Sequence, residues 1–251
     1  MAELAVDIKR IKQLLTKRKL DRLGIEYLST DVVRITEGIV GTDDGEALME
    51  VTSNIDVDIS GNGANGLDTG SVSNDTWYYL FLILNPTSGT VAGLFSLSDT
   101  APTMPSGYTK KRLVSVLRYF TADFLNFKQY NCRVFYPGPQ TVLSGGGSTS
   151  RTQIDISNYV PDTYGQSARL LFMSNWNNDF GNSAVYLEGL SGSTYHYTRA
   201  GLYAGSWWYR FRQTNEADIG MFYDSTMRVY YYTGDSDCRC SIFVKGYTLR
   251  L

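Results

Sequence analysis

The sequence predicts an all-β protein with two β-sandwich or jelly-roll-like domains, preceded by a short N-terminal α-helix. Aromatic residues make up 14% of the 251 residues, and 19 tyrosines occur with 24 glycines, a composition that suits many short strands joined by tight turns. The hydrophobic fraction of 43% is large enough to fill cores. After residue 24, apolar residues recur with the period of strands and no longer with that of a helix.

The first predicted unit, residues 1–24, is an amphipathic helix for attachment and oligomerisation. Leu4, Ile8, Ile11 and Leu15 are spaced by four, three and four, so they form one apolar stripe. In heptads they occupy a and d positions, and isoleucine there favours more than two strands, which predicts a homotrimeric coiled coil. Two heptads are too short to associate stably alone. The alternatives are a helix that packs on its own domain and a helix that lies on a membrane surface.

Residues 25–143 are predicted to form the first β domain. The apolar run 77–84 is typical of a central strand, and a turn at 85–89 pairs it with 91–97 in a hairpin. Residues 60–71 and 100–108 are rich in Gly, Asn or Pro, which predicts loops. Further strands are expected near residues 33–35, 55–59, 112–119, 124–127 and 132–136.

The second β domain is predicted to span residues 150–251. Pro137-Gly-Pro139 is expected to break the chain, and residues 144–149 form a Gly/Ser linker. Short strands beyond it favour a sandwich, and the absence of a fixed period argues against a solenoid. They are expected near residues 154–156, 168–173, 184–187, 207–212, 219–223, 227–232 and 240–251.

The charge distribution and the absence of known motifs limit the classes of function that the sequence predicts. The net charge of −2 combines +4 over residues 1–23 with −6 over the rest, so we expect no nucleic-acid binding by the acidic body. No apolar stretch approaches the roughly 18 residues of a membrane span, and no secretory signal is expected. His196 is the only histidine, and there is no nucleophile elbow, P-loop or dinucleotide motif. We therefore expect no enzyme and no cofactor. A glycan hydrolase built on scattered carboxylates is the less favoured alternative.

Oxygen-bearing side chains in two turn regions leave calcium binding open. Neither cluster has EF-hand spacing, and such residues are common in turns. The three cysteines, Cys132, Cys238 and Cys240, are odd in number and give no closed disulfide framework. Cys238 and Cys240 are too few and too close together to make a zinc site by themselves. The two candidate calcium clusters are Asp56, Asp58, Asn62, Asn65 and Asp68, and Asp235 with Asp237.

One segment of the second domain indicates sugar binding. Asn175-Trp-Asn-Asn-Asp-Phe-Gly-Asn182 is turn-like, and its local pattern buries none of its aromatic residues. Sugar rings stack on Trp and Tyr while Asn and Asp bind hydroxyls. The alternative is a structural role for the aromatics of this region, because Trp207 and Trp208 point to opposite faces of a strand and at least one is expected in the core or a subunit interface. The candidate glycan-binding residues are Trp176, Asn175, Asn177, Asp179, Tyr195 and Tyr197.

Several short motifs, taken in order, resemble modules of tail-fibre and related virion proteins of tailed bacteriophages. In the first domain these are Gly66-Leu-Asp-Thr-Gly-Ser71, Thr76-Trp-Tyr-Tyr79, Ser96-Leu-Ser98 and Ala101-Pro-Thr-Met-Pro-Ser-Gly-Tyr108. In the second they are Asp155-Ile-Ser-Asn-Tyr-Val-Pro161 and Val244-Lys-Gly-Tyr247. The resemblance covers roughly residues 30–251 and supplies no catalytic residues.

The resemblance implies a virion protein that is made in the bacterial host cytoplasm. A fibre or spike that attaches to a host-surface glycan through its C-terminal domain is the favoured interpretation. A capsid decoration, a head fibre or a baseplate-associated structural protein without receptor binding is the alternative. The expected partners are two further copies of the chain, other virion proteins that meet the N-terminal helix, and the host glycan.

Overall fold

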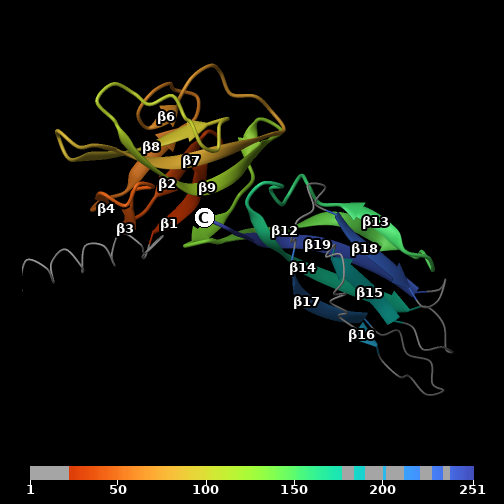
Figure 1. The fold of residues 1–251 in the computed structure, drawn as a ribbon. Helices are drawn as coiled ribbons and strands as arrows, with labels where there is room; N and C mark the ends of the chain where they lie inside the picture. Colours follow the sequence, from red (N-terminus) through yellow and green to blue (C-terminus); the bar gives the residue numbers. More distant parts are fainter. Residues whose placement is uncertain (1–22, 177–183, 190–199, 202–211, 221–227, 234–237) are drawn as a thin grey trace, which may run out of the picture. The chain divides into compact units, whose positions relative to one another are not determined.

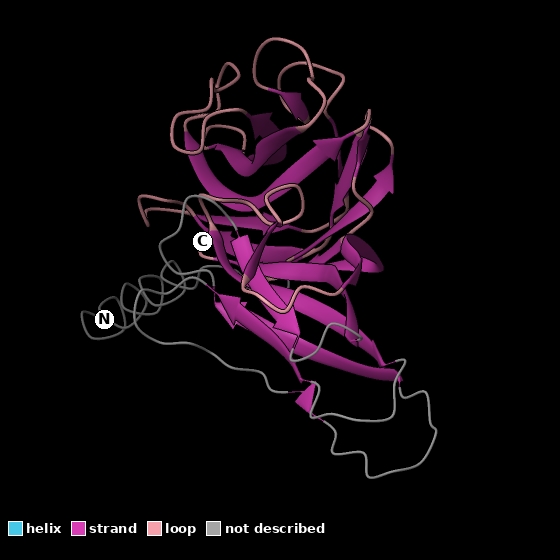
Figure 2. Ribbon diagram, turned by 90° about the vertical axis from the view of Figure 1, so that its right-hand side faces the viewer, coloured by secondary structure: helices cyan, strands magenta, loops and turns pink. Residues whose placement is uncertain are grey.

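The computed structural model describes residues 23–176, 184–189, 200–201, 212–220, 228–233 and 238–251. The expected N-terminal helix, with Leu4, Ile8, Ile11 and Leu15, lies outside these residues. Every regular element in the described part of the chain is a β-strand, as Figure 2 shows, so the all-β fold class is confirmed. The chain divides into two compact units between Val134 and Phe135 (Figure 1).

Four neighbouring strands of one sheet in the first unit have the antiparallel order β11-β1-β2-β5, formed by Lys128–Tyr130, Gly24–Ser29, Val32–Ile35 and Ile55–Asp58. The predicted alternation is visible in β2 and β5. Val33 and Val57 are cross-strand neighbours and are fully buried. On the opposite face, Arg34 donates two hydrogen bonds, of 2.7 and 2.9 Å, to the carboxylate of Asp56. One face therefore fills the core, and the other carries an ion pair.

The second sheet of this unit has the order β10-β9-β7-β8-β6, formed by Asp123–Phe124, Lys110–Phe120, Thr76–Asn85, Thr90–Ser96 and Gly66–Leu67. The predicted hairpin of 77–84 and 91–97 is confirmed by the antiparallel pairing of β7 with β8. Gly89 closes its turn with a φ of 74°, a conformation that favours glycine. β7 lies in the middle of the sheet, as its apolar run predicts.

The two sheets of the first unit pack closely enough to require glycine at one position. A Cβ atom on Gly93 of β8 would lie 2.2 Å from a methyl carbon of Val57 and 3.3 Å from Ile35 Cδ1. Aromatic rings fill the adjoining core. Phe124 stacks on Phe95 at 5.2 Å between centroids and meets Tyr119 edge-on at the same distance. A separate hairpin, β3 (Gly38–Gly41) with β4 (Leu48–Val51), completes the unit.

The second unit also contains two sheets. In one, four neighbouring strands have the order β17-β14-β19-β12, from Arg212–Gly220, Gly165–Trp176, Cys238–Leu249 and Arg133–Gly146. The other has the order β13-β18-β15-β16, from Thr152–Asp155, Arg228–Thr233, Ala184–Gly189 and Ala200–Gly201. Alternate residues of β19, namely Cys240, Ile242 and Val244, are fully buried and form part of this core.

Some details differ from the sequence predictions. Strand β12 continues through Pro137-Gly-Pro139, so the predicted break is wrong. Residues two apart direct their backbone nitrogens to the same side of a strand, so these prolines remove hydrogen-bond donors from one side of β12 only. The same strand includes Ser144–Gly146, the first part of the predicted linker segment 144–149. β17 is a polar strand that apolar patterning did not predict.

Candidate functional site

Asp68 brings together three of the four motif segments of the first domain that carry the phage-fibre resemblance. Its Oδ2 accepts hydrogen bonds from Ser96 Oγ at 2.8 Å and from the backbone N–H of Thr103 at 2.9 Å. Its own N–H donates to the carbonyl of Phe95 at 2.8 Å. Ser96 Oγ also accepts from the N–H of Ser98 at 2.9 Å. Three segments separated by up to 35 residues thus meet at one carboxylate.

The fourth motif segment belongs to the same region. Tyr78 is fully buried in β7, and its hydroxyl accepts from the backbone N–H of Ser73 at 2.8 Å. The ring meets Phe95 edge-on at 6.5 Å between centroids. These motif residues therefore secure loops on the second sheet of the first unit. These bonds hold the loop surface of this sheet in place.

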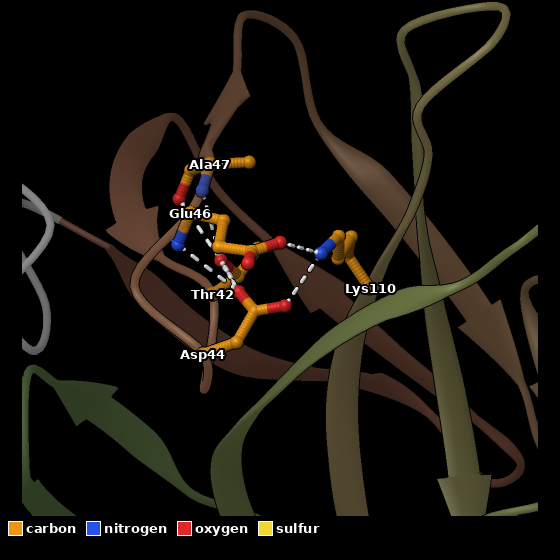
Figure 3. Close-up of polar contacts among 5 residues, drawn as sticks. All are labelled: Thr42, Asp44, Glu46, Ala47 and Lys110. Carbon is orange, nitrogen blue, oxygen red and sulfur yellow. Dashed lines mark hydrogen bonds and ion pairs between the residues drawn. The ribbon is translucent and has the colours of Figure 1, made fainter.

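An acidic turn is clamped to the beginning of β9, as Figure 3 shows. Lys110 Nζ donates to Asp44 Oδ2 at 2.6 Å and also pairs with Glu46. Asp44 Oδ1 accepts from the buried hydroxyl of Thr42 at 2.6 Å and from the N–H of Glu46 at 3.1 Å. The bond from Lys110, followed by that from Thr42, lowers the pKa of Asp44 to about 2.

The neighbouring residues repeat this pairing. Lys111 Nζ donates to Asp43 at 2.9 Å, and Arg112 approaches the same carboxylate at 3.7 Å. The acidic run in the turn between β3 and β4 is thereby fixed to the basic run at the beginning of β9. We did not predict this clamp. The charge runs 43–46 and 110–112 are visible in the sequence, but nothing local to either indicates that they meet.

Two tyrosine–aspartate pairs cross between the β1–β2 turn and the β9–β10 turn. Tyr119 donates to Asp31 Oδ1 at 2.5 Å, and Tyr27 donates to Asp123 Oδ2 at 3.3 Å. Burial, then the bond to Asp31, raises the pKa of Tyr119 to about 12. Burial also raises the pKa of Asp123, whose Oδ1 is buried without a hydrogen-bond partner. Each carboxylate is held by a tyrosine from a strand of the other hairpin, Tyr27 in β1 and Tyr119 in β9, so this arrangement is a structural crosslink.

The predicted glycan-binding residues are only partly placed. Asn175 and Trp176 are the last two residues of β14, where Trp176 is the backbone neighbour of Cys238 in β19. Asn177, Asp179, Tyr195 and Tyr197 lie outside the described residues, as does His196. The end of β14 therefore leads into the predicted segment, and whether the six residues converge stays a prediction.

A different surface of the second unit was not predicted. On the outward side of β13 and β18, Gln153 Oε1 accepts from the hydroxyl of Tyr230 and from Arg228, both at 3.3 Å. The guanidinium carbon of Arg151 lies 3.4 Å from the centroid of the Tyr230 ring. We call Arg151, Gln153, Arg228, Tyr230 and Tyr232 the β13–β18 face. Its signal in the sequence is the alternation of Arg228, Tyr230 and Tyr232 along one strand.

The first candidate calcium cluster is used in other ways. Asp56 pairs with Arg34, Asp58 Oδ1 accepts from the N–H of Ser60 at 2.9 Å, and Asn65 Oδ1 accepts from the N–H of Gly93 at 2.9 Å. Across the described ranges, no group of three or more His, Cys, Asp or Glu side chains is placed to hold a metal ion. Asp235 and Asp237 lie outside those ranges.

Two further findings bear on function. Within the part of the chain that the structure describes, no helix is long and apolar enough to cross a membrane. Comparison with models of known protein families and with curated proteins found no match.

Proposed function

We propose that this chain is a structural protein of a tailed-bacteriophage virion, a fibre or spike that attaches the particle to the host surface. The observation that carries the proposal is the convergence of the fibre-like motif segments around Asp68. Residues that resemble a family module in sequence also form one bonded unit in space. Such agreement is expected if the resemblance reflects a shared folded module.

Assembly is proposed to depend on the N-terminal helix. Leu4, Ile8, Ile11 and Leu15 would form the seam of a homotrimer, and the basic residues of the same segment would meet other virion proteins. We further propose that each compact unit is a β-sandwich, because each contains two sheets with a buried apolar core.

Host attachment is proposed to reside in the second unit. It has an aromatic and amide-rich segment at the end of β14 and an aromatic outward face on β18. Rigid aromatic side chains beside amide and charged groups suit the recognition of sugars. The acidic residues in the turn between β3 and β4 of the first unit instead form ion pairs with lysines of β9, which favours a structural role for this turn.

Immunogold electron microscopy of the phage particle whose genome encodes this chain tests the proposal. Antibodies raised against the purified full-length chain should label the distal end of the tail or its fibres. Labelling confined to the capsid would support a head fibre or decoration protein and reject the attachment role. Particles without label would reject the virion assignment, provided that the antibodies recognise the purified chain.

A further inference from the structure

The β13–β18 face combines aromatic rings with two guanidinium groups on a rigid strand pair. β13 and β18 are antiparallel, and Gln153 is the cross-strand neighbour of Tyr230. The opposite faces of the same strands carry Ile154, Val229 and Tyr231, which are buried. Core packing therefore fixes the positions of the outward residues. Sites on such strands hold their geometry better than sites on loops.

Contacts within the face hold both arginines near one tyrosine. Arg151 is exposed and lies over the Tyr230 ring at 3.4 Å, a cation–π contact. Arg228 donates to the same Gln153 oxygen as the Tyr230 hydroxyl does. A guanidinium has five N–H donors, so a single bond to Gln153 leaves Arg228 with donors for a ligand. Pre-organised side chains lose less conformational entropy when a ligand binds.

Two acidic residues, Asp155 and Glu188, are backbone neighbours of residues of the face. Asp155 is the cross-strand neighbour of Arg228, and its Oδ1 accepts from the N–H of Ser157 at 2.8 Å in a local turn. On the other side of β18, Glu188 of β15 is the backbone neighbour of Tyr230. An anionic ligand would therefore lie at the end of the face away from Asp155, over Arg151 and Gln153.

We propose that the β13–β18 face binds an acidic polysaccharide whose sugar rings carry carboxylates. Guanidinium groups pair with carboxylates through two parallel hydrogen bonds, and tyrosine rings pack against pyranose rings. A uronic acid unit presents the charge and the ring together. Polyol-phosphate chains have the charge but no ring, so the aromatic residues Tyr230 and Tyr232 favour the sugar acid. This inference rests on the proposed attachment function and names its ligand class.

Calorimetric titration of the full-length chain tests the inference. The probes are oligomers of galacturonic, mannuronic and guluronic acids, with methyl-esterified oligogalacturonate as the uncharged control. We expect at least one acidic oligomer to bind, its methyl ester to bind at least tenfold more weakly, and affinity to fall as salt rises. Arg151→Gln, Arg228→Gln and Tyr230→Ala should each weaken binding at least fivefold.

Two charge variants serve as matched controls. Arg133→Gln removes an exposed guanidinium at the beginning of β12 and should leave the affinity unchanged. Glu188→Gln removes a carboxylate from the backbone neighbour of Tyr230 and should leave the affinity unchanged or increase it. Equal loss in Arg133→Gln and Arg151→Gln would show general charge attraction and overturn the inference. Circular dichroism spectra matching the wild type would show that each variant folds.

Other outcomes separate the ligand class from the attachment function. Absence of binding to every acidic oligomer, or tighter binding of a polyglycerol-phosphate chain, overturns the inference. If the purified chain still binds host cells and the three face variants bind them equally well, the β13–β18 face is not the site although attachment stands. A wild-type chain that binds neither cells nor any oligomer rejects both.

Discussion

Single side chains in the first unit connect segments that are distant in the sequence. Asp68 is the clearest example, because one carboxylate oxygen accepts from both Ser96 and Thr103. Removal of a charged acceptor leaves its donors without a partner, which costs more than the net value of the bonds. The stability of the loops that meet at Asp68 should therefore depend on this residue.

We expect Asp68→Ala to lower the free energy of unfolding by about 2–3 kcal/mol. Urea denaturation followed by tryptophan fluorescence measures the change. Asp75→Asn, at an exposed position with a φ of 56° that asparagine accommodates, is the matched control and should change stability by less than about 0.5 kcal/mol. Equal stability of Asp68→Ala and the control would contradict the assigned role.

The clamp at Asp44 predicts a dependence on pH. The pKa of Asp44 is lowered to about 2 in the folded state, chiefly by Lys110 and next by Thr42. The pKa of an aspartate in an unfolded chain is about 3.9. The folded state therefore binds fewer protons in this range. The stabilisation is present above the unfolded pKa and is lost as the pH falls through about 2.

NMR titration of the carboxyl carbon measures this pKa directly. Lys110→Gln should raise the pKa of Asp44 toward its ordinary value, while Lys111→Gln, which removes the partner of Asp43, should leave it unchanged. An ordinary pKa in the wild type, or no change in Lys110→Gln, would count against the clamp.

The turn between β9 and β10 contains two residues whose backbone conformation is expected to lower the stability of the hairpin. Thr121 and Ala122 both have positive φ, 53° and 63°, which the two-residue turn from Phe120 to Asp123 requires. Neither residue favours this conformation, and a β-branched threonine least of all. Replacement of the pair by Asn-Gly should stabilise the chain by about 1 kcal/mol.

Thermal and urea denaturation measure that gain. Gly89→Ala is the opposite control, because Gly89 has a φ of 74° and an added Cβ atom would meet no atom within 4 Å, so the cost arises from the backbone alone. It should destabilise by about 1 kcal/mol. A destabilised Asn-Gly variant would mean that the hydroxyl bond from Thr121 to the carbonyl of Phe120 contributes more than the strain.

Strand patterns were predictable from the sequence wherever burial imposed a period. The apolar run 77–84 predicted β7, and the alternation at 55–59 predicted β5, because apolar side chains must face the core. The polar strand β17 was missed because its place follows from pairing with β14, which leaves no local signal. The β13–β18 face was missed for a related reason. Arg151 and Tyr230 are 79 positions apart, and only the register of two strands brings them together.

The whole chain is predicted to form a trimer that depends on residues 1–23. Light scattering of the full-length chain should give about three times the chain mass of 28.1 kDa. A shortened chain that starts at Gly24 should give a monomer, because the apolar seam is absent. A monomeric full-length chain would contradict this prediction, and a trimeric shortened chain would place the interface elsewhere.

The attachment role is tested most directly by competition for the host. Host cells are incubated with the purified full-length chain, washed, and then mixed with the phage whose genome encodes it, and unadsorbed particles are counted over time. We predict that the chain binds the cells and slows adsorption in proportion to its concentration, because it occupies the same receptors. Unchanged adsorption at concentrations that saturate the cell surface, or no binding of the chain to the cells, would contradict the account.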